Sequence, residues 1–298
     1  MLLVTTTKHS APILGMEKTI ENIARAGFDG IDFYAKDMLN DDSPYNSDGY
    51  MDIARAMREK AESCGIRFTQ AHAPYLSGSV AIGSFNAAFK DKIIRSLQFS
   101  AALGAEIIVV HPIKQLKYYM NAQALYEMNM EFYRSLIPYC EKYGIKVATE
   151  NMYETDQQRH MIRDSVCASP EEFRKYVDDL GSEWITGCVD LGHVGLCGRD
   201  ASDMLRYMGS DRVGALHIHD NDNFKDLHGL PCTINMNWDE ICKALADIGY
   251  RGNFTFEADG FLTRYSPEFL PTALKFMHDT GRYLINRIEA FKNGKAEK

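Results

Sequence analysis

Histidine and acidic side chains stand at the ends of short apolar runs throughout this chain of 298 residues. Carboxylate oxygens and imidazole nitrogens bind divalent cations, and the same groups move protons at carbon. The sequence therefore supplies ligands for a metal site and candidates for general acid–base catalysis. These residues are His72 in TQAHAPY, His111 in VVHP, Glu150 in ATENM, Asp190 and His193 in CVDLGH, His217 and His219 in LHIHDN, Asp226 and His228 in DLH, and Glu257 in FTFEADG.

The runs that end in these groups have the composition of short β-strands. Each is followed by a longer segment of helical character, and this alternation is typical of parallel α/β folds. We expect eight strands, at residues 2–6, 28–34, 66–72, 105–111, 145–151, 185–191, 213–219 and 253–258.

In seven of these units, a glycine stands where a helix must end before the next strand. The residue at the C-terminal end of a helix often adopts a left-handed conformation, which glycine favours. The units show no break in composition and no GxGxxG turn, which favours closure into a barrel over an open nucleotide-binding sheet. We predict a single (β/α)8 TIM-barrel domain of parallel strands over residues 1–298, with a frayed tail from about 287 to 298. The glycines are Gly27, Gly65, Gly104, Gly144, Gly181, Gly209 and Gly249.

The barrel prediction places the candidate residues together. Reactive groups of such barrels gather at the C-terminal ends of the strands, and six consecutive predicted strands end in a possible metal ligand. Because alternate side chains share a face, Glu150 and Glu257 should point into the barrel, while Thr149 and Phe256 face the helices. An inward carboxylate loses hydration, so a cation or a dense hydrogen-bond network must compensate it.

Composition restricts the class of protein. The net charge of −8 opposes binding to a phosphate backbone, so nucleic acid is not favoured as a partner. The seven cysteines show no CxxC spacing, and we expect them to be reduced packing residues. The first residues, MLLVTTTKHS, lack the pattern of a secretory signal, and no run is long enough to span a membrane. We therefore expect a cytoplasmic protein without a membrane partner.

The motifs HAPY, VVHP, ENM, DLGH, HIHDN, DLHGLP before NW, and FEADGF resemble the xylose isomerase-like TIM-barrel superfamily, which includes sugar isomerases, sugar epimerases and AP endonucleases. The resemblance spans most of the chain. From the epimerase branch it implies one Mn, Mg, Co or Zn ion, held by Glu150, Asp190, His217 and Glu257. From the endonuclease branch it implies up to three zinc ions, with further ligands from His72, His111, His193, Asp226 and His228. We expect these five residues, with His219, to bind substrate or additional metal.

Two features favour sugar chemistry over an endonuclease. The loop KDMLNDDSPYNSDGY carries four aspartates and one lysine, a composition that repels DNA. The spacing from His217 to DLH looks shorter than in the endonuclease branch, and HIHDN with DLHGLP and NW resembles sugar isomerase-like proteins. A third feature argues against a specific ketose 3-epimerase, because its usual strand-seven arginine is missing and Lys225 is the nearest cation. The sequence therefore leaves the identity of the sugar open.

We predict a divalent-metal-dependent carbohydrate isomerase or epimerase that moves a proton next to a carbonyl of a ketose or keto-polyol through an enediolate. Glu150 and Glu257 are the predicted catalytic residues, on opposite sides of the ion. The alternatives are a trinuclear-zinc phosphodiesterase of AP endonuclease type and an inosose dehydratase-like dehydratase. The expected partner is a small-molecule sugar or sugar derivative, and the resembling family suggests a homo-oligomer.

Aromatic and basic residues in the same loops are further candidates for contact with a sugar or a phosphate. Packing within the loops and solvent exposure are equally good interpretations of them. The aromatic residues are Tyr75, Phe85, Tyr118, Tyr119, Tyr153 and Phe261, and the basic residues are Lys114, Lys117, Arg159 and Arg163.

Overall fold

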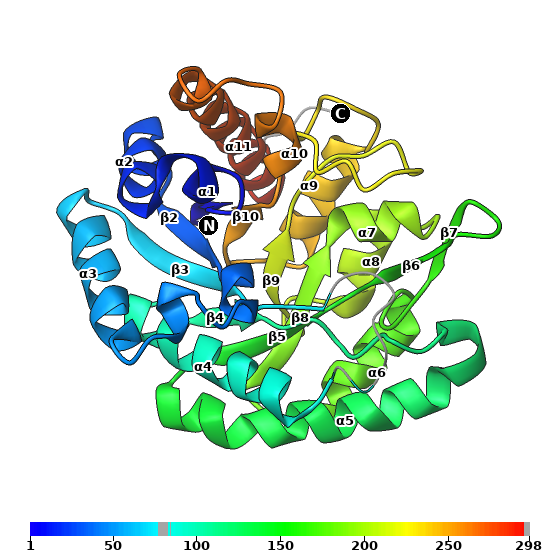
Figure 1. Ribbon diagram of the computed structural model, residues 1–298. Coiled ribbons are helices and arrows are strands. Elements are labelled where there is room, and N and C mark those ends of the chain that lie inside the picture. Colours follow the sequence, from blue (N-terminus) through cyan, green and yellow to red (C-terminus); the bar gives the residue numbers. More distant parts are fainter. Residues whose placement is uncertain (77–82, 84, 295–298) are drawn as a thin grey trace.

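Parallel strands form the centre of the computed structural model, which describes residues 1–76, 83 and 85–294 (Figure 1). Neighbouring strands pair in the order β10-β1-β2-β3-β4-β5-β8-β9, and a parallel bridge between Ile218 and Phe256 joins the two ends of this sheet. The predicted (β/α)8 TIM barrel is confirmed, and every predicted strand is present with its ends shifted by at most two residues. The strands are β1 (Leu3–Thr6), β2 (Gly30–Tyr34), β3 (Arg67–His72), β4 (Ile107–Val109), β5 (Lys146–Glu150), β8 (Ile185–Asp190), β9 (Val213–His217) and β10 (Phe254–Phe256).

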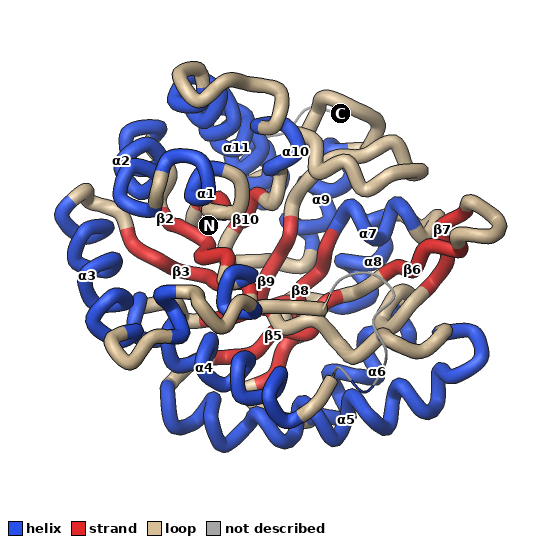
Figure 2. The backbone as a smooth tube through the Cα atoms, in the orientation of Figure 1, coloured by secondary structure: helices blue, strands red, loops and turns tan. Residues whose placement is uncertain are grey.

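Helices surround the strands (Figure 2). The last of them, α11, packs against both α2 and α9 and so joins the first and last parts of the outer layer. None of the helices in the described residues combines the length and the apolar composition needed to cross a bilayer. The helices are α1 (Ser10–Leu14), α2 (Met16–Ala26), α3 (Tyr50–Ser63), α4 (Ala87–Leu103), α5 (Tyr118–Tyr143), α6 (Pro170–Leu180), α7 (Leu191–Leu196), α8 (Ala201–Met208), α9 (Trp238–Asp247), α10 (Asp259–Leu262) and α11 (Leu270–Lys292), with 3-10 turns η1 (Lys36–Leu39) and η2 (Pro44–Asn46).

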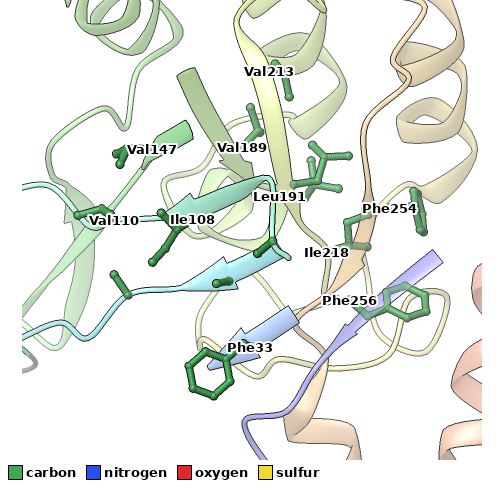
Figure 3. Packing of buried hydrophobic residues seen from close by; sticks show 14 of the residues in the cluster. Phe33, Ile108, Val110, Val147, Val189, Leu191, Val213, Ile218, Phe254 and Phe256 are labelled. Atoms are coloured by element: carbon green, nitrogen blue, oxygen red, sulfur yellow. The ribbon is translucent and has the colours of Figure 1, made fainter. Parts of the chain in front are cut away.

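Strand alternation separates the apolar core into two layers. Outward residues such as Val110, Val147 and Phe256 pack against the helices (Figure 3). A second, smaller cluster has the opposite orientation, and each of its members except Ile107 lies two residues before a candidate site residue. This inner layer forms the floor beneath the polar groups at the strand ends. It consists of Ile107, Val109, Ala148, Cys188 and Ala215.

The helix boundaries follow from local capping. Gly27 and Gly104 end α2 and α4 in the left-handed region, with φ of 101° and 98°. At the other end, the Asn86 side chain accepts a hydrogen bond from the Phe89 amide and begins α4. All seven glycines predicted as helix ends have positive φ.

Two segments differ from the sequence prediction. Helix α11 continues to Lys292, past the point where we expected fraying, because Ile288 is buried and Arg287 pairs with Asp239 at 2.6 Å. Residues 295–298 lie outside the described part of the chain. The segment after β5 folds into an antiparallel hairpin of β6 (Tyr153–Asp156) and β7 (Met161–Asp164), which extends away from the barrel in Figure 1.

Candidate functional site

Four predicted metal ligands converge at one end of the barrel. Glu150, Asp190 and His217 are the last residues of β5, β8 and β9, and Glu257 directly follows β10. One donor atom from each lies within 4.8 Å of the others. His217 Nδ1 is 2.8 Å from Glu150 Oε1, 3.3 Å from Glu257 Oε2 and 3.9 Å from Asp190 Oδ2. All four side chains are buried, so solvent does not screen their charges.

The charges in this group compensate one another. Burial favours the neutral form of Glu150, but His217 and His111 hold the pKa of its carboxyl well below the usual value. Burial acts on Glu257 in the same way, and Lys8 and His217 hold its pKa well below the usual value. Both carboxylates are therefore ionised at neutral pH. Burial alone would lower the pKa of His217, yet Cys188, Glu150 and Glu257 raise it well above the ordinary value, so the imidazole supplies positive charge.

His72 and His111 form a pair of neutral imidazoles beside Glu150. The two Nε2 atoms are 3.1 Å apart, and His111 Nε2 lies 2.8 Å from Glu150 Oε2. Burial, reinforced by His111, lowers the pKa of His72 to about 3, and burial also lowers the pKa of His111. Glu150 Oε2 is buried without a well-oriented hydrogen bond, as expected of an atom that is available as a ligand.

A second acid–imidazole group lies next to the first. His193 Nε2 and His228 Nε2 are 3.8 Å and 3.2 Å from Asp226 Oδ2. Burial opposes protonation of His193, but Asp190 and Asp226 raise its pKa to about 9. Burial likewise opposes protonation of His228, whose pKa rises to about 10 beside Glu257 and Asp226.

The DLGH motif holds Asp190 in place from several directions. Asp190 caps α7 by accepting a hydrogen bond from the His193 amide at 2.7 Å. His219 Nε2 approaches Asp190 Oδ1 at 3.1 Å, and it can do so because a Cβ atom on Gly192 would lie 2.0 Å from the His219 ring. Asn151 accepts from the Asp190 amide at 2.8 Å and donates to the Asp190 carbonyl at 3.0 Å. These contacts fix β5 to β8 at the site.

A cavity of about 260 Å³ opens over these groups. Seven of the ten predicted site residues line it, and Asp190, His217 and His219 lie outside its lining although they contact residues that do line it. The ten residues predicted from the sequence therefore lie together at one end of the barrel. The lining residues are Lys8, His72, Tyr75, Leu76, His111, Lys114, Glu150, Met152, Tyr153, His193, Asp226, His228 and Glu257.

Three of the ten additional aromatic and basic candidates, Tyr75, Tyr153 and Lys114, line the cavity. Lys117 is exposed at the start of α5, and Lys225 is exposed in the loop after β9. Neither of these two lysines lines the cavity.

Two charged residues of the site were missed by the sequence analysis. Lys8 follows β1 and lies 3.1 Å from Glu257 Oε1 and 3.0 Å from Asp259 Oδ1. Asp32 is buried within β2, and burial raises its pKa to about 7. Both had a signal in the sequence, because Lys8 follows the first predicted strand and Asp32 interrupts the apolar second strand.

Comparison with known proteins identifies the family of this barrel. The model of the family described as "Xylose isomerase-like TIM barrel" matches residues 20–277. A curated relative, the uncharacterized protein MJ1311 of Methanocaldococcus jannaschii, is 27% identical over 158 residues, which are 52% of this chain and 51% of that protein. The chain thus matches about half the length of this relative.

Solved structures of sugar epimerases share the fold. D-psicose 3-epimerase in the presence of D-fructose has a TM-score of 0.73 and 19% identity, with 96% of this chain and 99% of that chain covered. The apo form of 3-keto-D-glucoside 4-epimerase, YcjR, from E. coli has a TM-score of 0.70 and 17% identity, with 96% and 99% covered. Since the family match extends over most of the barrel, the chain belongs to the xylose isomerase-like TIM-barrel family.

Proposed function

We propose that this chain is a divalent-metal-dependent carbohydrate isomerase or epimerase that moves a proton next to the carbonyl of a ketose or keto-polyol. The observation that carries the proposal is the convergence of three buried carboxylates and one imidazole within 4.8 Å, beside a cavity of about 260 Å³. The names of the structural neighbours, which are sugar epimerases, support the carbohydrate part.

The donor set fits a divalent cation. Three carboxylates with one imidazole suit Mn, Mg, Co or Zn, and the positive charge would relieve repulsion among the buried carboxylates. The holding residues would be Glu150, Asp190, His217 and Glu257. When bound, such an ion supplies Lewis acidity that polarises the carbonyl group of a sugar.

The chain itself supplies the groups that move the proton. Glu150 and Glu257 line the cavity and are ionised despite their burial. One of them removes the proton next to the carbonyl, and the other, once protonated from solvent, returns a proton to the enediolate. Return to the other face of the same carbon gives an epimer, and return to the neighbouring carbon gives an isomer.

The surrounding side chains would hold the sugar in place. His72 and His111 are neutral, and His72 Nδ1 donates to the Ala73 carbonyl at 2.8 Å, which leaves His72 Nε2 as an acceptor. The Nε2 atom of His111 approaches His72 Nε2 and Glu150 Oε2, so the other ring nitrogen of His111 is the one that would contact a sugar hydroxyl. Tyr75 and Tyr153 line the same cavity, where their rings can cover the apolar face of a sugar. The neighbouring side chains thus orient the substrate while the two carboxylates move the proton.

A second candidate function is phosphodiester hydrolysis by three zinc ions. The observation in its favour is that further groups that can hold a metal adjoin the first, one with His72, one with His193, one with Asp226 and one with Asp259. The acidic loop after β2 remains an argument against a nucleic-acid substrate.

The test is elemental analysis of the protein purified without chelator, beside the variant Glu150→Gln. About one divalent ion per chain that is lost or weakened in the variant supports the proposal. Exchange of a ketose proton with solvent, followed by NMR in heavy water, then identifies the reaction, and loss of water from the sugar would identify a dehydratase instead. Three zinc ions per chain would support the phosphodiesterase, and a chain that binds no divalent ion would overturn both functions.

A further inference from the structure

Two lysines line the cavity, and they differ in their ionic partners. The ammonium of Lys8 lies 3.1 Å from Glu257 and 3.0 Å from Asp259, so nearby carboxylates neutralise its charge. Lys114 Nζ donates to the Tyr153 carbonyl at 3.3 Å. No carboxylate of residues 1–76, 83 and 85–294 lies within ion-pair distance of Lys114. Its positive charge is therefore not balanced by a direct ion pair.

The surroundings of Lys114 withdraw it from bulk solvent. Its side chain is half-buried, and its ammonium lies 5.5 Å from the centre of the Tyr153 ring. Burial lowers the pKa of Lys114, and the carboxylates of Glu150, Asp226 and Glu154, which lie beyond ion-pair distance, only partly offset this effect. An anion bound directly to the ammonium would stabilise its charged form further. Other basic residues of this region already have partners, since Arg163 pairs with Asp156 at 2.8 Å. Lys114 is thus the cavity cation that remains available to a ligand.

We propose that Lys114 binds an oxyanionic substituent, a phosphate or a carboxylate, on the sugar that the site converts. This inference rests on the proposed function, because Lys114 would bind the charged end of the sugar while Glu150 and Glu257 act on its reacting carbon. All three side chains line the same cavity, so a single ligand can reach both ends. An ammonium has three donors, and at least one is free for a phosphate or carboxylate oxygen.

The test compares substrates that differ only in the charge at one end. A ketohexose, its 6-phosphate and the hexuronate with a carboxylate at the same carbon are offered to the metal-loaded protein. Two measurements are made for each sugar, the kcat/KM of proton exchange with solvent and the Kd from titration calorimetry. The variants are Lys114→Met, which removes the charge, and Lys114→Arg, which retains it. The matched control is Lys117→Met, an exposed lysine near the same strand end that does not line the cavity.

We expect the wild-type protein to prefer an anionic sugar. In Lys114→Met, the Kd of that sugar should rise and its kcat/KM should fall by about 10- to 100-fold, with a larger change in KM than in kcat. Lys114→Arg should retain most of the binding, and Lys117→Met should resemble the wild type. The Kd and the kcat/KM of the neutral ketose should change by less than about threefold in each variant. Comparison of the Kd and kcat/KM of the 6-phosphate with those of the hexuronate shows which oxyanion the site prefers.

An equal loss for neutral and anionic sugars in Lys114→Met, or an unchanged Kd for the anionic sugars, would overturn the role of Lys114. Proton exchange that is restricted to neutral ketoses would overturn it while leaving the proposed function intact. Absence of proton exchange with every sugar would count against the proposed function, and calorimetry would still decide whether Lys114 binds the oxyanion.

Discussion

The two carboxylate oxygens of Glu257 have different partners. Lys8 Nζ lies 3.1 Å from Oε1, and His217 Nδ1 lies 3.3 Å from Oε2. The substitution Lys8→Met removes a cation that keeps the pKa of Glu257 low. The pKa of the carboxyl should rise by about 1 unit or more. A proton-transferring carboxylate loses activity as pH falls through its pKa, so the acid limb of the pH profile for proton exchange should move to higher pH.

Lys8→Arg is the control for this pH shift, because it keeps the positive charge and should keep the acid limb near its wild-type position. An acid limb that stays in place in Lys8→Met would show that Lys8 does not control the ionisation of Glu257.

Asp32 gives a second prediction at the scale of one residue. Burial raises its pKa from 3.8 to about 7, so folding favours the protonated form. The unfolded chain releases this proton at lower pH, and the free energy of unfolding should therefore fall as pH rises from about 4 to about 7. The loss should be on the order of 2–4 kcal/mol.

Asp32→Asn should remove this part of the pH dependence. The measurement is urea unfolding of wild type and variant at several pH values, with chelator present so that metal binding does not contribute. Parallel pH curves for the two proteins would contradict the assignment to Asp32.

Candidate ligands are easier to recognise in this sequence than the residues that pair with them. Histidines and acids at strand ends are conspicuous, so Glu150 and His217 could be proposed as ligands from the sequence alone. Lys8 could not be assigned a role, because its contacts with Glu257 and Asp259 join residues from the two ends of the chain, about 250 positions apart. Only the closed barrel brings these charges together.

At the scale of elements, the turn from β8 into α7 requires a glycine. A Cβ atom at Gly192 would lie 2.0 Å from the His219 ring. Gly192→Ala should therefore displace His219 from Asp190 and reduce both stability and metal affinity. We expect a loss of roughly 1–3 kcal/mol in the free energy of unfolding, the usual cost of overpacking a core.

The control is Gly49→Ala, where no atom lies within 4 Å of the added methyl group. It should change the free energy of unfolding by less than about 0.5 kcal/mol. Chemical denaturation and metal titration of both variants provide the comparison, and a Gly192→Ala protein with wild-type metal affinity would argue against this packing constraint.

Helix α11 gives a prediction about its last turns. Ile288 is fully buried, whereas Tyr283 on the same helix is 56% exposed. Ile288→Ala should lower the free energy of unfolding by about 2–5 kcal/mol, and Tyr283→Ala should have a much smaller effect. Equal effects in thermal and urea unfolding would mean that these turns do not pack on the barrel.

The elements were predictable to different degrees for a physical reason. Repeated glycine ends and apolar runs are local signals, and they located all eight barrel strands. The hairpin of β6 and β7 has few apolar residues, so YETDQQRHMIRD gave no strand pattern. The end of α11 depends on contacts with distant residues such as Asp239, and its charged sequence alone suggested a tail.

At the scale of the whole molecule, a cation bound by four strand ends should stabilise the entire fold. The stabilisation is about 2.7 kcal/mol when the free ion is at 100 times its Kd. Addition of a divalent ion should raise the Tm, chelator should reverse the increase, and Asp190→Asn should reduce both effects. A Tm that does not respond to any divalent ion would contradict the metal site.

The bridge between Ile218 and Phe256 closes the ring of strands, and two proposed ligands flank it. His217 precedes Ile218, and Glu257 follows Phe256. One ion bound to His217 and Glu257 would therefore cross-link the two edge strands of the sheet, β9 and β10. The ring opens most easily where its hydrogen bonds are fewest. The Ile218 and Glu257 amides, which donate across this seam at 2.9 Å and 3.1 Å, should therefore exchange with deuterium faster when the ion is removed.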